Sequence, residues 1–123
     1  MADVNQLYNQ AEQLKDQGQL SEAIDRLQEL LTIDPRHVLS HLALAVLYGK
    51  VGDHERAIEH GHRACEIDPS DAFNFTAMSV TYQRAWQGTQ QGEYIQFAEA
   101  AMARARELEQ AAALKAAQQR PSN

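Results

Sequence analysis

The feature that most constrains this chain is an internal repeat with a period of 34 residues. The segment Gly18–Ile24 is matched by Gly52–Ile58, each beginning with glycine and ending in Ala-Ile, and Ile33-Asp34-Pro35 is matched by Ile67-Asp68-Pro69. A fixed period of this length is the signature of stacked repeats, in which each unit buries its apolar face against its neighbours. We therefore expect the chain to fold as a stack of similar units.

Within each unit, apolar side chains recur three and four residues apart, which is the spacing of one face of an α-helix. The pattern predicts helices over residues 4–16 and 20–33 in the first unit, and over 37–51 and 54–67 in the second. Glycine separates the two helices of a unit, and an Asp-Pro pair closes it, because proline suits the first turn of a new helix.

This pattern resembles the tetratricopeptide repeat, a helix-turn-helix unit. The family places small residues at positions eight, twenty and twenty-seven. Here these positions hold Ala11, Ala23 and Leu30 in the first repeat, and Ala45, Ala57 and Ala64 in the second. Gly61 departs from the pattern, since the family prefers a large apolar residue there, so we expect a neighbour to fill the gap. The resemblance implies an all-α, right-handed superhelix that binds other proteins.

A third repeat is predicted over residues 72–110, after repeats at about 4–37 and 38–71. Its second helix begins late, because Ala98 follows Ala57 by 41 residues, which is an insertion of 7. The insertion lies near 86–94, and two interpretations fit: a loop anchored by Trp86 and Tyr94, or a continuation of the preceding helix. No Asp-Pro pair closes this repeat, so its last helix is expected to continue to about residue 119 as a polar cap. Residues 1–119 would then form one domain, and 120–123 a tail.

The composition narrows the classes of partner. A hydrophobic content of 44% supports a packed core, and 17 acidic against 11 basic residues give a net charge of -6, which disfavours nucleic acid and anionic lipid. No segment approaches the roughly 18 apolar residues of a membrane span, and the N-terminus does not have the pattern of a signal peptide. The single cysteine, Cys65, cannot form an internal disulfide. We expect a cytoplasmic location and no membrane or nucleic acid partner.

The family resemblance also implies where a partner binds. In tetratricopeptide repeats the first helix of each unit lines a concave groove, and its second, fifth and ninth positions make most ligand contacts. The corresponding residues are Asn5, Tyr8 and Glu12, then Leu39, Leu42 and Val46, then Phe73, Thr76 and Val80, with Arg84 as a nearby cation. Because the middle of this set is apolar, we predict that the groove holds an apolar peptide or helix of another protein.

Two alternatives fit the same sequence. The first is a homo-oligomeric structural module that associates through the groove or through a stripe on the last helix, formed by Ala98, Ala101, Ala105, Leu108 and Ala112. The second is a metal- or haem-responsive binder that uses His37, His41, His62 or Cys65.

The repeat register favours structural roles for most of these metal-binding side chains. His41 falls on a packing position, Cys65 replaces a leucine of the first repeat, and His60 is expected on the solvated convex face. No metal or cofactor is therefore predicted.

Catalysis is not expected. The chain lacks a Gly-Lys-Ser/Thr phosphate loop, a Gly-x-Ser-x-Gly elbow, a Cys-x-x-Cys pair and a His-Glu-x-x-His helix. It also lacks the two-lysine clamp with which one tetratricopeptide subclass holds the C-terminal carboxylate of chaperone tails, so binding of that type is not predicted. The sequence thus indicates a non-catalytic adaptor or scaffold.

Overall fold

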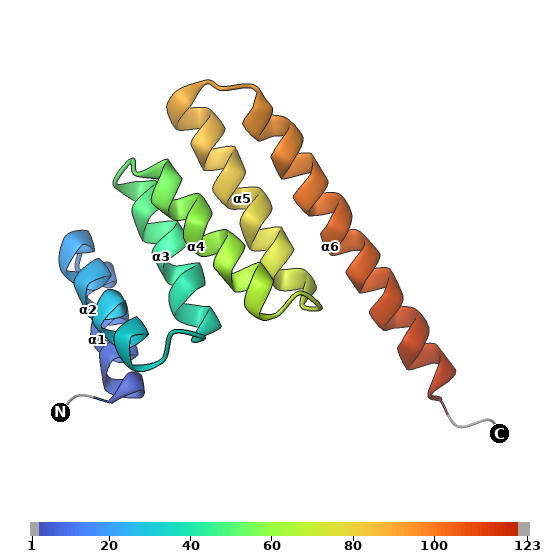
Figure 1. Cartoon of the computed structure of the whole chain (residues 1–123), viewed down its shortest axis with the longest axis horizontal. Coiled ribbons are helices and arrows are strands. Elements are labelled where there is room, and N and C mark those ends of the chain that lie inside the picture. The colour runs from blue at the N-terminus through green and yellow to red at the C-terminus, as the bar shows by residue number, and fades with distance from the viewer. Residues whose placement is uncertain (1–2, 121–123) are drawn as a thin grey trace.

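In the computed structural model, which describes residues 3–120, the chain forms six α-helices in three antiparallel pairs (Figure 1). The pairs are α1 (Val4–Asp16) with α2 (Leu20–Ile33), α3 (Val38–Lys50) with α4 (His54–Ile67), and α5 (Ala72–Thr89) with α6 (Glu93–Gln118). Successive pairs stack through contacts of α2 with α3 and of α5 with both α3 and α4. No strand occurs among the described residues, and the all-α superhelical class expected from the sequence is confirmed.

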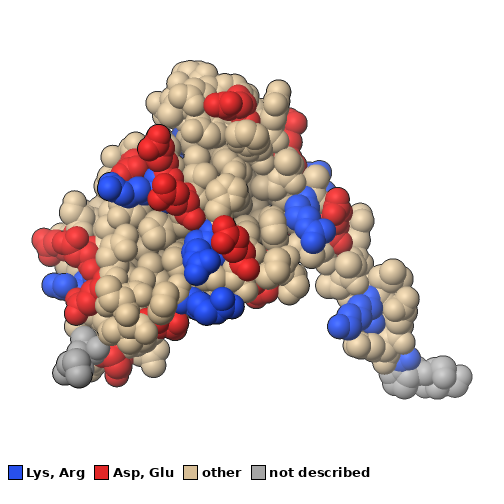
Figure 2. Space-filling view, viewed as in Figure 1, with Lys and Arg blue, Asp and Glu red and all other residues tan. Residues whose placement is uncertain are grey.

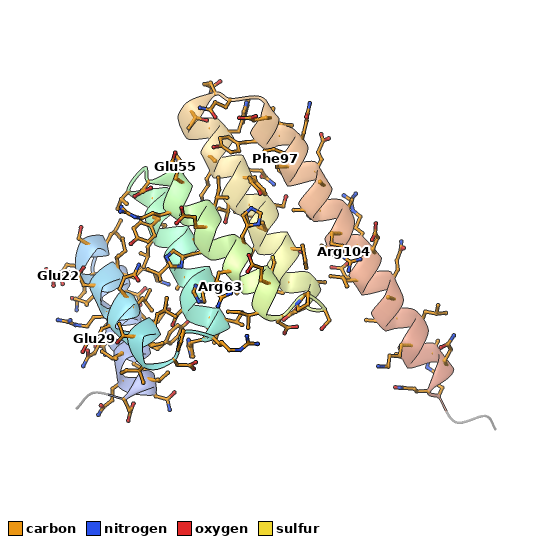
Figure 3. All side chains as sticks on the ribbon, in the orientation of Figure 1. Glu22, Glu29, Glu55, Arg63, Phe97 and Arg104 are labelled. Atoms are coloured by element: carbon orange, nitrogen blue, oxygen red, sulfur yellow. The ribbon has the colours of Figure 1, made fainter. Side chains whose placement is uncertain are left out.

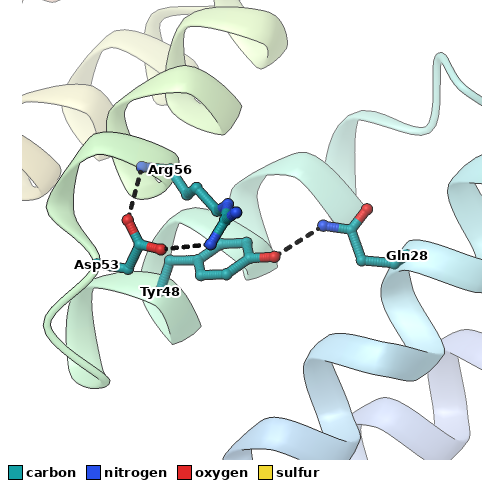
Figure 4. Close-up of polar contacts among 4 residues, drawn as sticks. All are labelled: Gln28, Tyr48, Asp53 and Arg56. Carbon is teal, nitrogen blue, oxygen red and sulfur yellow. Dashed lines mark hydrogen bonds and ion pairs between the residues drawn. The ribbon is translucent and has the colours of Figure 1, made fainter.

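Local sequence explains where the helices of a pair begin and end. Gly18 and Gly52 have φ angles of 78° and 86°, a left-handed conformation that glycine adopts without steric cost. Directly after the second of these turns, Asp53 caps α4 by accepting a hydrogen bond of 3.2 Å from the backbone N–H of Arg56. The same carboxylate accepts a second bond of 2.8 Å from the Arg56 guanidinium (Figure 4).

Neighbouring pairs are also joined by polar contacts. The side-chain amide of Gln28 on α2 donates to the hydroxyl of Tyr48 on α3 at 3.0 Å (Figure 4). Asn74 is buried on α5, where its amide donates to the carbonyl oxygen of Asp68 at 3.1 Å. These bonds fix the registers of α3 and α5 against the preceding helices.

The core lies within and between the pairs, and its small residues lie where helices approach closely. The buried apolar positions of the first two pairs are Leu7, Ala11, Ala23, Leu27, Leu30, Leu44, Ala45, Leu47, Ala57 and Ala64, with Cys65 at the edge. A Cβ placed on Gly61 would lie 2.5 Å from the sulfur of Met78. The Met78 side chain of α5 therefore fills the gap left by this glycine, as expected from the sequence.

The seven extra residues of the third pair lengthen its helices. Trp86 is half-buried within α5, and only residues 90–92 separate α5 from α6. Gln90 ends α5 in the left-handed conformation, with φ of 61°. The added residues extend α5 at its C-terminal end and α6 at its N-terminal end, beside the turn that joins them, so the remainder of each helix keeps its packing face. The interpretation of this segment as an anchored loop is wrong, and the continuation of the helix is correct.

The last helix is longer than its partner, and its C-terminal part extends beyond the stack (Figure 1). Every residue from 109 to 120 is exposed, whereas Ala98, Ala101 and Ala105 are buried in the packing of α6 on the body. The alanine stripe suggested for self-association is therefore largely occupied inside the chain.

The outer surface carries charges of both signs. On the face shown in Figure 2, basic and acidic side chains are interspersed. Several form ion pairs between residues three apart on one helix, such as Arg63 with Glu66 at 3.4 Å and Arg104 with Glu107 at 3.0 Å. Figure 3 shows Glu22 and other charged side chains of the second helices directed away from the core. Within residues 3–120, no helix has both the length and the apolar character needed to cross a membrane.

Candidate partner-binding groove

A groove of about 260 Å³ runs along the first helices of the three pairs, α1, α3 and α5. We call it the concave groove. It is lined by Tyr8, Glu12, Lys15, Leu39, Leu42, Ala43, Val46, Phe73 and Ala77. The structure thus brings together six residues that the sequence placed at a binding site: Tyr8, Glu12, Leu39, Leu42, Val46 and Phe73.

The groove exposes large apolar side chains. Leu39 on α3 is 54% exposed, and Phe73 on the neighbouring α5 is 62% exposed. Leu42 and Val46 are half-buried and form the apolar wall between α1 and α5. Exposed apolar side chains that gather in one concave surface are typical of an interaction site.

Polar groups lie at one side of the groove. Lys15 pairs with Glu12 at 3.1 Å on α1, so these two charges compensate each other. Burial, followed by the nearby Glu12 carboxylate, raises the pKa of the Tyr8 hydroxyl. Tyr8 therefore stays neutral at physiological pH and offers a hydroxyl that can both donate and accept a hydrogen bond.

Two kinds of comparison, with family models and with solved structures, show which known proteins this fold is similar to. Residues 11–52 match the family model described as TPR repeat. Over this segment the chain is similar to the tetratricopeptide repeat. No curated protein matches the sequence.

Solved structures with the same fold have low sequence identity to the chain. A crystal structure of MamA has 20% identity and a TM-score of 0.76, and the match covers 90% of this chain and 61% of that one. The chain therefore spans about three fifths of the length of MamA. The translocator chaperone SycD of Yersinia enterocolitica has 20% identity and a TM-score of 0.70, and the match covers 85% of this chain and 74% of SycD. The first TPR of Spaghetti (RPAP3), solved bound to an HSP90 peptide, has 17% identity and a TM-score of 0.61. This match covers 90% of the present chain and 94% of the RPAP3 domain.

Four residues predicted from the repeat positions do not line the concave groove: Asn5, Thr76, Val80 and Arg84. Asn5 and Val80 are exposed outside it, and the Thr76 hydroxyl donates to the carbonyl of Ala72 at 3.2 Å. The side chain of Arg84 lies instead beside Gly49 near the end of α3.

The sequence interpretation also missed three groove residues, Lys15, Ala43 and Ala77. Ala43 and Ala77 are one repeat period apart, so a small residue recurs at the sixth position of the tetratricopeptide unit. That recurrence was a usable signal, because a small side chain at this position keeps the groove open.

Two histidines, His41 on α3 and His60 on α4, are in contact, and His60 differs from its expected place. It is partly buried rather than on the solvated convex face, since its Nδ1 lies 3.0 Å from Nδ1 of His41 and its ring stacks on Tyr48. His41 is 5% exposed, and its Nε2 lies 2.9 Å from the carbonyl oxygen of Pro35. The structural role expected for His41 thus agrees with its burial.

These contacts define the proton positions of the pair. The Pro35 carbonyl can only accept, so Nε2 of His41 carries the hydrogen and its Nδ1 is the acceptor. Nδ1 of His60 must then donate to His41. Burial, with a smaller effect of His41, lowers the pKa of His60 to about 4, and burial also lowers that of His41. Both rings are neutral at physiological pH.

The remaining candidate metal ligands have other partners or are inaccessible. Nδ1 of His37 accepts from the backbone N–H of Ser40 and caps α3, and Nε2 of His62 lies 2.7 Å from the Tyr82 hydroxyl. Burial raises the pKa of the Cys65 thiol to about 11. Within residues 3–120, no group of three or more His, Cys, Asp or Glu residues is placed to hold a metal ion.

Proposed function

We propose that the protein is a non-catalytic adaptor whose concave groove binds an apolar segment of another protein. The observation that carries this proposal is the convergence of exposed Leu39 and Phe73, with Leu42 and Val46 between them, on one groove formed by three successive repeats. Removing each of these side chains from water stabilises the complex, by about 25 cal/mol per Å² of apolar area buried.

The shape and polarity of the groove favour the apolar side of a helix or short peptide. Its walls are aliphatic and aromatic, and the small side chains of Ala43 and Ala77 leave room for side chains of a partner between α3 and α5. The Glu12–Lys15 pair and the Tyr8 hydroxyl lie at the α1 side, where they can meet polar groups of the bound segment.

The structural neighbours support the general class of function. The RPAP3 repeat domain is bound to a peptide in its structure, and SycD is a chaperone of a secretion translocator. For this chain we infer a scaffold that acts in the cytoplasm, with a protein partner and without nucleic acid, membrane, metal or cofactor. Self-association is a second candidate function. It is favoured by a second apolar groove, which lies between α5 and α6 at the end of the stack.

The proposal is tested with the variant Leu39→Glu/Phe73→Glu, because both side chains are more than half exposed and their replacement should leave the fold intact. Affinity capture with quantitative mass spectrometry should show partners that are lost from this variant. The matched control is Leu114→Glu, since Leu114 is 62% exposed on α6 and lies outside the groove.

Direct titration of the identified segment should then show a loss of affinity of at least about tenfold for Leu39→Glu/Phe73→Glu. Circular dichroism must show unchanged helix content in both variants. If all captured partners bind the folded groove variant as well as the wild type, the groove is not the binding site.

A further inference from the structure

The junctions inside the stack show how one repeat receives the next. The first helix of the third pair, α5, packs against both α3 and α4 of the second pair. Met78 of α5 lies opposite Gly61 of α4, and Gly88 lies against the ring of His54. A following first helix therefore occupies the groove between the two helices of the pair before it.

The third pair presents the same kind of groove at the end of the stack. This end groove, about 410 Å³, lies between α5 and α6 and contains Trp86, Ile95 and Met102. The shift of 41 residues that aligns Ala98 with Ala57 also aligns Ile95 with His54 and Met102 with Gly61. The end groove thus corresponds to the surface on which a further first helix would pack, and Ile95 is 40% exposed there.

The opposite end of the stack is polar. On α5, Met78 and Thr81 face the second pair. The residues of α1 at the same repeat positions, two periods earlier, are Gln10 and Gln13. Both glutamines are exposed. Packing this face of α1 into the apolar end groove of another copy would remove amide groups from water without hydrogen-bond partners. Head-to-tail stacking of copies is therefore disfavoured.

We propose that the end groove binds a second copy of the chain, with α6 of each protomer lying antiparallel to α6 of the other in a two-fold dimer. In this arrangement the partner's helix runs in the direction that a further first helix would take, because first and second helices of the stack are antiparallel. A two-fold interface uses the same surface on both copies, so that surface must be complementary to itself.

The charges of the end groove meet that requirement. Glu99 and Arg106 both line it and lie on either side of Met102 along α6. A two-fold axis beside Met102 places Glu99 opposite the partner's Arg106, and the reverse pair follows by symmetry. Within residues 3–120 neither side chain forms an ion pair in the single chain. The two charge pairs set the register, and Trp86, Ile95 and Met102 supply the apolar contact.

The dimer is tested first by sedimentation equilibrium of the full chain over a range of concentrations. We expect the mass to rise from 13.8 kDa towards twice that value as the concentration increases. Arg106→Glu and Glu99→Arg should each weaken dimerisation by at least about tenfold, because like charges then face each other twice across the axis. The double variant Glu99→Arg/Arg106→Glu should restore dimerisation. Arg104→Glu is the matched control, since it reverses the same charge on α6 outside the end groove.

Trp86 gives an independent readout, because it is the only tryptophan and lines the end groove. Its fluorescence should shift to shorter wavelength as the dimer forms. The protein concentration at the midpoint of this shift should agree with the dissociation constant from sedimentation equilibrium. A wild-type mass of 13.8 kDa at every concentration overturns the proposal, as does a double variant that does not recover.

The variant Leu39→Glu/Phe73→Glu should dimerise like the wild type, because both residues lie outside the end groove. Failure of the concave groove to bind a partner and failure of the end groove to dimerise are therefore separate outcomes.

Discussion

Lowering the pH should destabilise the protein through His60. In the folded chain this imidazole is partly buried against Tyr48 and donates to His41, and burial lowers its pKa from 6.5 to about 4. In the unfolded chain the ring is in water and takes up a proton below about pH 6.5. Between these two values the unfolded state binds more protons than the folded state, so the free energy of unfolding falls as the pH falls.

The size of the effect follows from the pKa difference. Each unit of difference corresponds to about 1.4 kcal/mol, so the interval from 6.5 to about 4 gives a loss of up to roughly 3 kcal/mol. The loss is complete only below the folded pKa and is absent above the unfolded pKa. A total stability of about 5 to 15 kcal/mol is usual for a small domain, so this change is large enough to measure.

The assay is urea denaturation followed by circular dichroism, at a series of values between about pH 7 and pH 4.5. The informative variant is His60→Gln, because glutamine does not titrate and its amide can still donate to Nδ1 of His41. Between about pH 7 and pH 4.5, the free energy of unfolding of this variant should fall by about 2 kcal/mol less than that of the wild type. His62→Gln, on the exposed side of the same helix, controls for the loss of an imidazole. If wild type and His60→Gln lose stability in parallel, the pKa of His60 is not depressed by burial.

Further predictions concern packing, capping, the thiol and the groove. Gly61→Ala should lower stability by about 1 kcal/mol in thermal or urea unfolding, because its methyl group meets Met78; in a Met78→Ala background the same change should stabilise α4. Asp53→Ala should cost about 1 kcal/mol through loss of the α4 cap, measured in the same way. Cys65 should react with a thiol reagent only after urea unfolds the chain, because it is buried and its pKa is about 11; rapid labelling of the native protein would contradict its burial. A free Glu-Glu-Val-Asp peptide should show no micromolar binding in calorimetry, since the two-lysine clamp is absent.

The repeat period explains why the helices were predictable from the sequence. The bounds expected for the helices Val4–Asp16 and His54–Ile67 agree with those of α1 and α4, because glycine turns and Asp-Pro pairs recur at the same phase as the apolar residues. The insertion was ambiguous for a physical reason. Its glutamines favour a helix and its glycines disfavour one, so the same residues fit either a loop or two longer helices joined by a short turn.

The concave groove was predictable only in part. Leu39 and Leu42, chosen by repeat position, line the groove because α1 and α3 follow the 34-residue period, whereas Val80 and Arg84 lie outside it. That these side chains bind a partner stays a prediction. The contact between His41 and His60 could not be inferred from helix faces, because it depends on how α3 packs against α4. Pair packing of this kind is decided in three dimensions and leaves no periodic signal in the sequence.

The two proposed surfaces use different sides of α5, and this has a consequence for binding. Phe73 and Ala77 line the concave groove, whereas Ser79, Gln83 and Trp86 line the end groove. A dimer formed through the end groove would leave both concave grooves open and would join them in one particle. Two linked sites bind a bivalent or clustered partner more tightly than one site, because the second contact is made at a high effective concentration. Arg106→Glu should therefore leave the affinity for a single peptide unchanged and weaken binding to a surface that displays many copies of it. Equal binding of the variant and the wild type to that dense surface would show that the two surfaces do not act together.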